Sequence, residues 1–239
     1  MRVCAHRLRA ARIVARAATI VLAVAVLPGP TWMTPAVADT VHSAPALLNQ
    51  AQDHASLYLR VFGVTPPPYG HVDLCQRDPG ECDPGAWEEV RRPGKGAALA
   101  ELDRVNREVN AEIKPVTDLE QYGVEDYWTI PRSGRGDCED YALLKRHRLI
   151  KAGWPPSSLL MTVVFDERKE GHAVLTARTT DGDLILDNKT GTIKLWNQTP
   201  YAYVMRSSYL DPHVWMSLDP QRAVPTVPIP VAGVRNARP

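Results

Sequence analysis

The chain has 239 residues with 28 basic and 27 acidic side chains, which gives a formal net charge of +1. This near balance argues against a nucleic-acid-binding or anionic-membrane-binding surface, because such surfaces need an excess of basic residues. The length suits one domain with a sizeable core once an N-terminal leader is set aside.

The first 38 residues have the features of an export signal. Five arginines precede an apolar run from Ala17 to Leu27, and the segment contains no acidic residue. Ala36-Val37-Ala38 then matches a small-x-small cleavage site. The run is shorter than the about 20 apolar residues that a membrane span needs. We therefore expect residues 1–38 to be a signal peptide and the mature chain, with a formal charge of −4, to be periplasmic or secreted without membrane insertion. A retained N-terminal anchor is the alternative.

Residues 39–96 are expected to hold one helix and a Pro/Gly-rich loop. Apolar residues recur at helical spacing from Ala44 to Val61. From Val64 to Gly96, prolines and glycines are too frequent for a long regular element. We expect an ordered loop there, long enough to indicate a feature near a binding surface.

Cysteine usage predicts one disulfide and one free thiol. The leader contains Cys4, so three cysteines remain in the mature chain. Cys75 and Cys82 lie close together in the loop, and an odd count in an exported protein favours one pair and one leftover thiol. We therefore expect a Cys75–Cys82 disulfide and a free Cys138. A zinc site of His71, Cys75 and Cys82 is the alternative, although its spacing is wide and a fourth ligand is not evident.

Two further helices are predicted after the loop. The first spans Ala97–Ile113 and ends at Pro115, and the second runs from about Cys138 to Lys151. In the second helix, the four residues from Lys145 to Arg148 indicate a basic, solvated face. Between the helices lie three aromatic residues that we interpret as core cover: Tyr122, Tyr127 and Trp128.

Beyond the second of these helices the hydrophobic period changes to two, which predicts strands. The expected strands are Leu159–Phe165, His172–Thr179, Leu184–Leu186, Thr192–Trp196 and Tyr201–Met205. Helices first and consecutive antiparallel strands afterwards predict an α+β domain with N-terminal helices packed on an antiparallel sheet. The Pro-rich residues 216–239 are expected to be disordered.

Cys138 has the sequence context of a nucleophile. It stands where the glycine-broken loop Ser133–Gly136 enters a helical pattern, and a helix N-terminus favours a thiolate over a thiol. A cysteine nucleophile also needs a base and a group that orients the base.

His172 and Asp187 are the candidates for these two roles. His172 stands at a strand start, and Asp187 closes the next strand, where its carboxylate could hold Nδ1–H of His172. Each also has an ordinary reading as a turn residue. A hairpin with Asp181-Gly182 as its turn would place Asp187 opposite Thr176, four residues from His172, so a bulge or wider loop would be needed.

Five segments in order resemble the bacterial transglutaminase-like cysteine proteinases. They are Leu102–Asn110, Asp126–Trp128 with Pro131, Gly134–Ala142 with Lys145, His172–Leu175 and Leu184–Asn188. The resemblance implies a papain-like fold over a catalytic core of residues 97–215 and a Cys138–His172–Asp187 triad that cleaves proteins through a thioester. The best-known members are periplasmic proteases that cleave large surface adhesins and control biofilm attachment. The resemblance therefore also implies a protein substrate and a membrane-anchored regulator as partners.

The acidic neighbours of Cys138 allow two interpretations. Asp137 as N-cap, with Glu139 and Asp140 in the first helical turn, is favourable capping and dipole chemistry. Carboxylates beside a thiolate also repel it, and a hard cation with oxygen ligands would relieve that repulsion. The adhesin-cleaving relatives are calcium-dependent, so the resemblance implies a calcium ion bound by Asp137, Glu139 and Asp140. No organic cofactor is expected.

Two other functions fit the same residues. A protein-glutamine acyltransferase, a true transglutaminase, uses the same triad, and a non-catalytic binding protein could keep the fold. The complete set of Cys138, His172 and Asp187 argues against the second of these.

Overall fold

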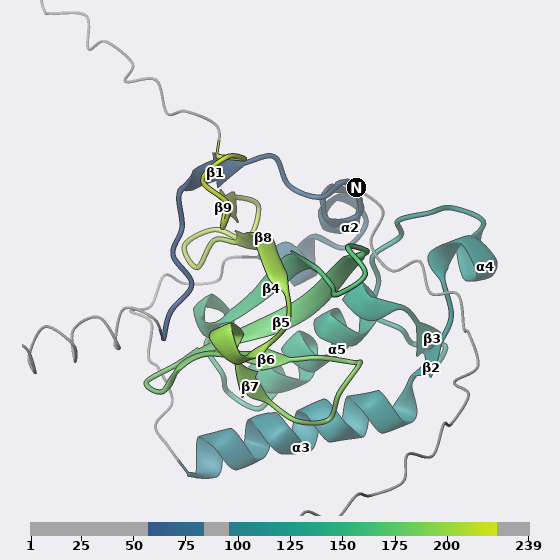
Figure 1. Cartoon of the computed structure of the whole chain (residues 1–239). Helices are drawn as coiled ribbons and strands as arrows, with labels where there is room; N and C mark the ends of the chain where they lie inside the picture. Colours follow the sequence, from purple (N-terminus) through teal and green to yellow (C-terminus); the bar gives the residue numbers. More distant parts are fainter. Residues whose placement is uncertain (1–56, 84–95, 224–239) are drawn as a thin grey trace, which may run out of the picture.

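A seven-stranded antiparallel sheet forms the centre of the molecule (Figure 1). The computed structural model describes residues 57–83 and 96–223. In sheet order the strands are β1 (Gly63–Thr65), β9 (Trp215–Ser217), β8 (Ala202–Ser207), β4 (Leu159–Phe165), β5 (Gly171–Thr179), β6 (Gly182–Leu186) and β7 (Lys194–Leu195). The predicted strands are present, although the one expected at Thr192–Trp196 is shorter and continues into the 3-10 turn η3 (Trp196–Gln198).

Two helices cover one face of this sheet. Helix α5 (Cys138–Lys151) packs on β5 and β4, and α3 (Ala97–Glu112) packs on α5 and β6, as Figure 1 shows. Leu102, Val105 and Val109 of α3 are buried at i, i+3 and i+7, so one stripe of that helix faces the core. The structure thus confirms the α+β architecture. Among the described residues, no helix is long and apolar enough to cross a membrane.

The loop expected from Val64 to Gly96 contains a helix, so that expectation was wrong. Helix α2 (Tyr69–Arg77) begins directly after Pro68 and is followed by the 3-10 turn η1 (Pro79–Cys82). Prolines therefore flank α2 without entering it, which is compatible with a regular helix. The structure contains the expected disulfide, which joins Cys75 of α2 to Cys82 of η1.

The helix expected at Ala44–Val61 lies largely outside the described residues, and its described part, from residue 57, is not helical. There the backbone is held against β6. The N–H of Leu59 donates to Oδ2 of Asp183 at 2.8 Å, and the carbonyl of Leu57 accepts from the N–H of Asp183 at 2.9 Å. These contacts with a distant residue replace the local bonds of a helix.

The basic face predicted for α5 is only partly solvated, because His147 and Arg148 are half-buried and the other two residues are buried. Lys145 is fully buried and Arg146 is nearly so, because α5 is covered on several sides. Arg146 donates to the carbonyls of Leu159 (3.2 Å) and Glu81 (3.1 Å), so the disulfide-bonded segment docks on this side of the helix. His147 adds an ion-pair geometry to Glu81 at 2.9 Å.

The β5–β6 hairpin turns at Thr180-Asp181, not at the expected Asp181-Gly182. Thr179 pairs with Gly182 and Leu175 pairs with Leu186. The Thr179 hydroxyl organises this turn, because it accepts from the N–H of Asp181 and donates to the carbonyl of Gly182. The register brings Asp187 two residues closer to His172 than expected, so no bulge is needed.

Candidate active site

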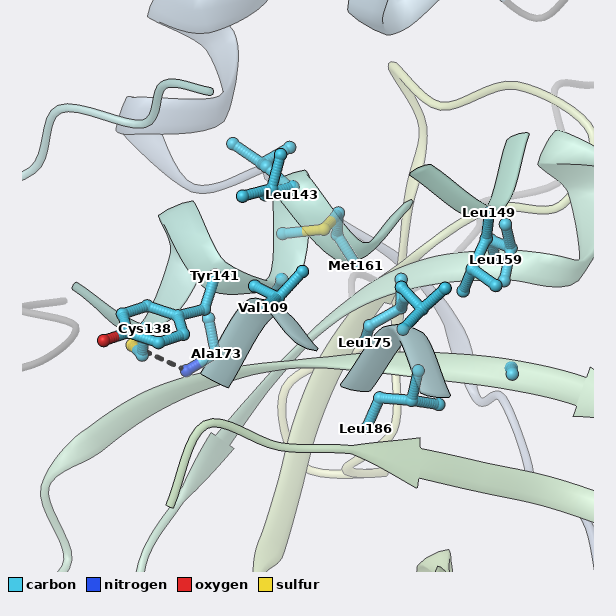
Figure 2. Close-up of a cluster of buried hydrophobic side chains, with 14 of the residues drawn as sticks. Val109, Cys138, Tyr141, Leu143, Leu149, Leu159, Met161, Ala173, Leu175 and Leu186 are labelled. Atoms are coloured by element: carbon cyan, nitrogen blue, oxygen red, sulfur yellow. Dashed lines mark hydrogen bonds between the residues drawn. The ribbon is translucent and has the colours of Figure 1, made fainter. Parts of the chain in front are cut away.

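Cys138 is the first residue of α5, and β5 holds its sulfur. A short parallel pairing of β2 (Lys114–Pro115) with β3 (Arg135–Gly136) leads the chain into this helix. The N–H of Ala173 donates to Sγ of Cys138 at 3.1 Å, the contact drawn as a dashed line in Figure 2. A Cβ at Gly136 would lie 2.4 Å from Oδ2 of Asp140, so the entry to α5 requires glycine. The sulfur is thus fixed between the helix start and the strand.

The expectation of a free Cys138 is not met in this structure. No cysteine is free in the described part of the chain, and Cys138 is disulfide-bonded. A nucleophilic role therefore concerns the reduced form of this residue.

His172 and Asp187 form a buried hydrogen-bonded pair. Nε2 of His172 lies 2.9 Å from Oδ1 of Asp187, and the side chains are 1% and 3% exposed. The nitrogen engaged is Nε2, not the Nδ1 that the sequence-based interpretation assigned. In the described part, Nδ1 is buried without a hydrogen-bond partner. Nδ1 is therefore the ring nitrogen that is available to interact with the Cys138 sulfur. That sulfur already contacts Ala173, the residue after His172.

Asp187 is held as an ionised carboxylate. Burial is the largest single influence on its pKa and raises it, but several hydrogen bonds outweigh burial. Bonds from His172, from the N–H of Lys189 and from the hydroxyl of Tyr201, together with the His172 charge, lower the pKa of Asp187 to about 2. The carboxylate is therefore ready to stabilise a positive imidazolium.

Tyr201 and Asn110 support Asp187 and were not identified from the sequence. The Tyr201 hydroxyl donates to Oδ2 of Asp187 at 2.5 Å, and Nδ2 of Asn110 donates to the Asp187 carbonyl at 2.8 Å. Asn110 closes one of the segments that carry the family resemblance, which was the only available signal for it. Nothing in the local pattern around Tyr201 indicates its role.

Three buried carboxylates gather beside Cys138. Ligand oxygens of Asp118, Asp137 and Glu139 lie within 4.8 Å of one another. Asp118 begins α4 (Asp118–Tyr122) and was missed, because it lies 19 residues before Asp137 in sequence. Asp140 is not part of this group, and its Oδ1 accepts from the N–H of Thr129 at 2.9 Å.

Asp137 occupies the predicted N-cap position of α5, but its carboxylate does not cap the helix. Its side chain makes no capping hydrogen bond to α5, and Oδ2 accepts instead from the N–H of Asp118 at 3.3 Å. In the described part, no N–H or hydroxyl donor reaches Oδ1 of Asp118, Oδ1 of Asp137 or Oε1 of Glu139. Buried acceptors without donors are costly, so these three oxygens could be stabilised by a bound cation.

Burial and mutual repulsion disfavour the ionised forms of these acids. Burial first, and neighbouring carboxylates second, raise the pKa of Asp137 to about 7 and hold the pKa of Glu139 well above its usual range. Burial also raises the pKa of Asp118, and it raises the pKa of Asp140 to about 9. An oxygen-seeking divalent cation would remove this penalty, so the residues present fit such an ion.

The three residues of the alternative zinc site lie together, but two of them form a disulfide and the third is a buried histidine. His71 lies beside Cys75 and Cys82, whose sulfurs are bonded to each other. Burial lowers the pKa of His71 to about 4, and Nδ1 of this neutral ring accepts from Nε1 of Trp215 at 3.3 Å. The oxidised sulfurs are not zinc-binding thiolates.

The chain is similar to a known protein family over most of its length. A family model described as bacterial transglutaminase-like cysteine proteinase BTLCP matches residues 61–223. No curated protein matches the chain. The calcium-bound structure of LapG from Legionella pneumophila is similar, at 25% identity and a TM-score of 0.45, over 56% of this chain and 76% of that chain. An EGTA-treated LapG structure from the same organism has 28% identity and a TM-score of 0.41, over 47% of this chain and 64% of that one.

Proposed function

Because the chain belongs to the bacterial transglutaminase-like cysteine proteinases, a family of cysteine proteases, we propose that Cys138, His172 and Asp187 are its catalytic triad. Its helices and antiparallel sheet are the papain-like, transglutaminase-like fold of that family. The observation that carries the proposal is the buried His172–Asp187 pair beside the strand backbone that contacts the Cys138 sulfur.

The triad hydrolyses a peptide bond in two stages. Nδ1 of His172 takes the proton of the reduced Cys138 thiol, and the sulfur attacks the peptide carbonyl carbon. The carbon–nitrogen bond breaks as His172 passes that proton to the leaving amine, which gives a thioester. His172 then takes a proton from water, the resulting hydroxide attacks the thioester, and the carbon–sulfur bond breaks to release the carboxyl product and restore the thiol.

Backbone N–H groups stabilise the two charges of this reaction. The N–H of Ala173 donates to the Cys138 sulfur and supports its thiolate form. The N–H of Cys138, at the first residue of α5, is the proposed donor to the oxyanion, because the first N–H groups of a helix have no acceptor within it.

Asp118, Asp137 and Glu139 are proposed to hold a calcium ion. Two observations support this set: each residue offers a carboxylate oxygen within 4.8 Å of the others, and each has one buried oxygen without an N–H or hydroxyl donor in the described part of the chain. This replaces Asp140 of the predicted set with Asp118. When bound, the ion supplies positive charge that offsets the carboxylates next to the thiolate. The acids by themselves fix the approach of α4 to the start of α5 through the Asp118–Asp137 bond.

The substrate is a protein, and we propose a surface or periplasmic protein such as an adhesin as the one cleaved. This substrate class, a membrane-anchored regulator and export by residues 1–38 all rest on the family resemblance and the leader pattern. The leader lies outside the described residues.

The proposal is tested by comparing N-termini of exported and surface proteins between wild-type cells and cells with Cys138→Ala or His172→Ala. Loss of specific N-termini in both variants is expected. His147→Ala is the matched control, because His147 lies on α5 and pairs with Glu81 instead of the triad. Unchanged cleavage in both triad variants would refute the assignment, and incorporation of a labelled primary amine without new N-termini would favour acyl transfer.

A further inference from the structure

The Asp187 carboxylate is held from three directions. Oδ1 accepts from Nε2 of His172 at 2.9 Å and from the N–H of Lys189 at 3.0 Å, whereas Oδ2 accepts from the Tyr201 hydroxyl at 2.5 Å. The first two bonds share Oδ1, so Tyr201 supplies the hydrogen bond of the other oxygen, Oδ2. Without the Tyr201 hydroxyl, both remaining hydrogen bonds would end on Oδ1, and the carboxylate could pivot about that oxygen.

The Tyr201 side chain itself is well supported. Its ring meets the His172 ring edge-on, with centroids 5.6 Å apart, and Nζ of Lys189 lies 5.9 Å from its centre. Lys189 is in turn ion-paired with Asp166 at 2.7 Å. Burial and the adjacent Asp187 charge raise the pKa of Tyr201, so its hydroxyl stays a donor at any working pH.

The backbone of Asp187 has a separate support from α3. Nδ2 of Asn110 donates to its carbonyl at 2.8 Å and also lies 3.2 Å from the carbonyl of Thr190. Asn110 therefore fixes where the loop after β6 runs, and Tyr201 fixes how the carboxylate is turned. The loop can stay in place when the Tyr201 hydroxyl is removed.

We propose that Tyr201 is a positioning residue that orients the Asp187 carboxylate, which in turn keeps Nδ1 of His172 directed to the Cys138 sulfur. This inference rests on the proposed triad and adds a fourth member that touches neither substrate nor sulfur. A hydrogen bond to a supporting carboxylate acts through the imidazole that it aligns, as second-layer partners do at other sites.

Tyr203 of β8, two residues after Tyr201, provides a matched control. Its hydroxyl lies 3.0 Å from Oγ1 of Thr199 and donates to the carbonyl of Trp196 at 3.3 Å, so Tyr203→Phe removes the same atom without touching Asp187. A general effect of losing a tyrosine hydroxyl from this region would appear in both variants.

The experiment measures the rate at which iodoacetamide alkylates Cys138 in the full chain. The protein is first reduced and freed of reductant, the calcium concentration is held constant, and the modified peptide is quantified by mass spectrometry. Tyr201→Phe is expected to slow alkylation roughly tenfold, as loss of a hydrogen bond to a charged group predicts, with Tyr203→Phe unchanged. Tyr201→Phe added to Asp187→Asn is expected to change the rate by less than roughly twofold, because both act through one group.

Proton NMR of the same proteins gives a second reading. The low-field resonance of the imidazole proton on Nε2 of His172 is expected in wild type and Tyr203→Phe, and it should move in Tyr201→Phe. Wild-type alkylation in Tyr201→Phe, or an equal further loss on top of Asp187→Asn, would overturn the role of Tyr201. Unchanged alkylation in both His172→Ala and Asp187→Asn would instead overturn the triad itself, and the role of Tyr201 with it.

Discussion

Oε2 of Glu139 lies 3.3 Å from Sγ of Cys138, and both side chains are buried. A carboxylate at this distance opposes a thiolate, so a cation bound to Glu139 favours the reactive sulfur. Chelation of calcium with EGTA is therefore expected to slow iodoacetamide alkylation of reduced Cys138, and added calcium should restore the rate. Bound calcium should also raise the free energy of unfolding by about 2.7 kcal/mol when the free calcium concentration exceeds the Kd roughly a hundredfold.

Magnesium serves as the control for this measurement. Mg²⁺ is smaller than Ca²⁺, requires a stricter octahedral geometry and usually keeps more of its bound water. The thermal midpoint and the alkylation rate should rise together on calcium titration. Identical rates and midpoints in EGTA and in excess calcium would contradict a cation at this cluster.

The observed carboxylate cluster contains Asp118, which the set predicted from the sequence did not include. Asp118→Asn removes one ligand charge, and the calcium affinity is expected to fall at least about tenfold, since even outer-layer partners of metal sites are worth roughly that much. Isothermal titration calorimetry measures the affinity. Glu120→Gln is the matched control, because Glu120 lies on the same helix with its side chain exposed. Equal calcium affinity in wild type and Asp118→Asn would remove Asp118 from the site.

The sequence predicts the elements of the active site better than their contacts. Helix α5 and strand β4 have their expected bounds, because strong periodicity and a glycine-broken entry mark them. Asp118 could not be predicted, since its proximity to Asp137 depends on how the chain between α3 and α5 folds back. Such long-range juxtaposition leaves no local pattern.

The hydrophobic periodicity of the sequence also could not predict that charged side chains on α5 are buried. Lys145 and Arg146 follow one another on α5 and indicate a solvated face, yet the disulfide-bonded segment and α3 enclose that part of the helix. A helix covered on several sides has no single apolar stripe. The observed hairpin turn likewise includes a side-chain contact, in which the Thr179 hydroxyl accepts from the N–H of Asp181.

The Cys75–Cys82 disulfide closes a short segment whose far end docks on α5. Cys75→Ala with Cys82→Ala is expected to lower the free energy of unfolding by about 2 kcal/mol, mainly through the greater freedom of the unfolded chain. Urea denaturation measures this loss. Alkylation of Cys138 at temperatures well below the midpoint should stay near the wild-type rate, because the triad lies elsewhere. A wild-type midpoint in the double variant would contradict a stabilising role.

Lys145 is fully buried on α5, and in the described part its Nζ has no hydrogen-bond partner. Burial lowers its pKa from 10.5 to about 7, with the Asp187 charge opposing the shift. Below pH 7 the folded and unfolded chains are both protonated, so the folded state bears the full cost of an enclosed ammonium. Between about pH 7 and the unfolded pKa, the unfolded chain binds more protons, so stability rises with pH.

Lys145→Met is therefore expected to stabilise the protein most below pH 7, by on the order of 4 kcal/mol, with the gain shrinking as pH rises towards 10. Methionine is apolar and flexible enough to fill the space of the lysine stem. Urea midpoints at a series of pH values measure the difference. Lys151→Met, at an exposed position of the same helix, should give a small effect that does not vary with pH in this window. A Lys145→Met difference that is constant from pH 6 to pH 10, or that grows with pH, would contradict a buried amine with a lowered pKa.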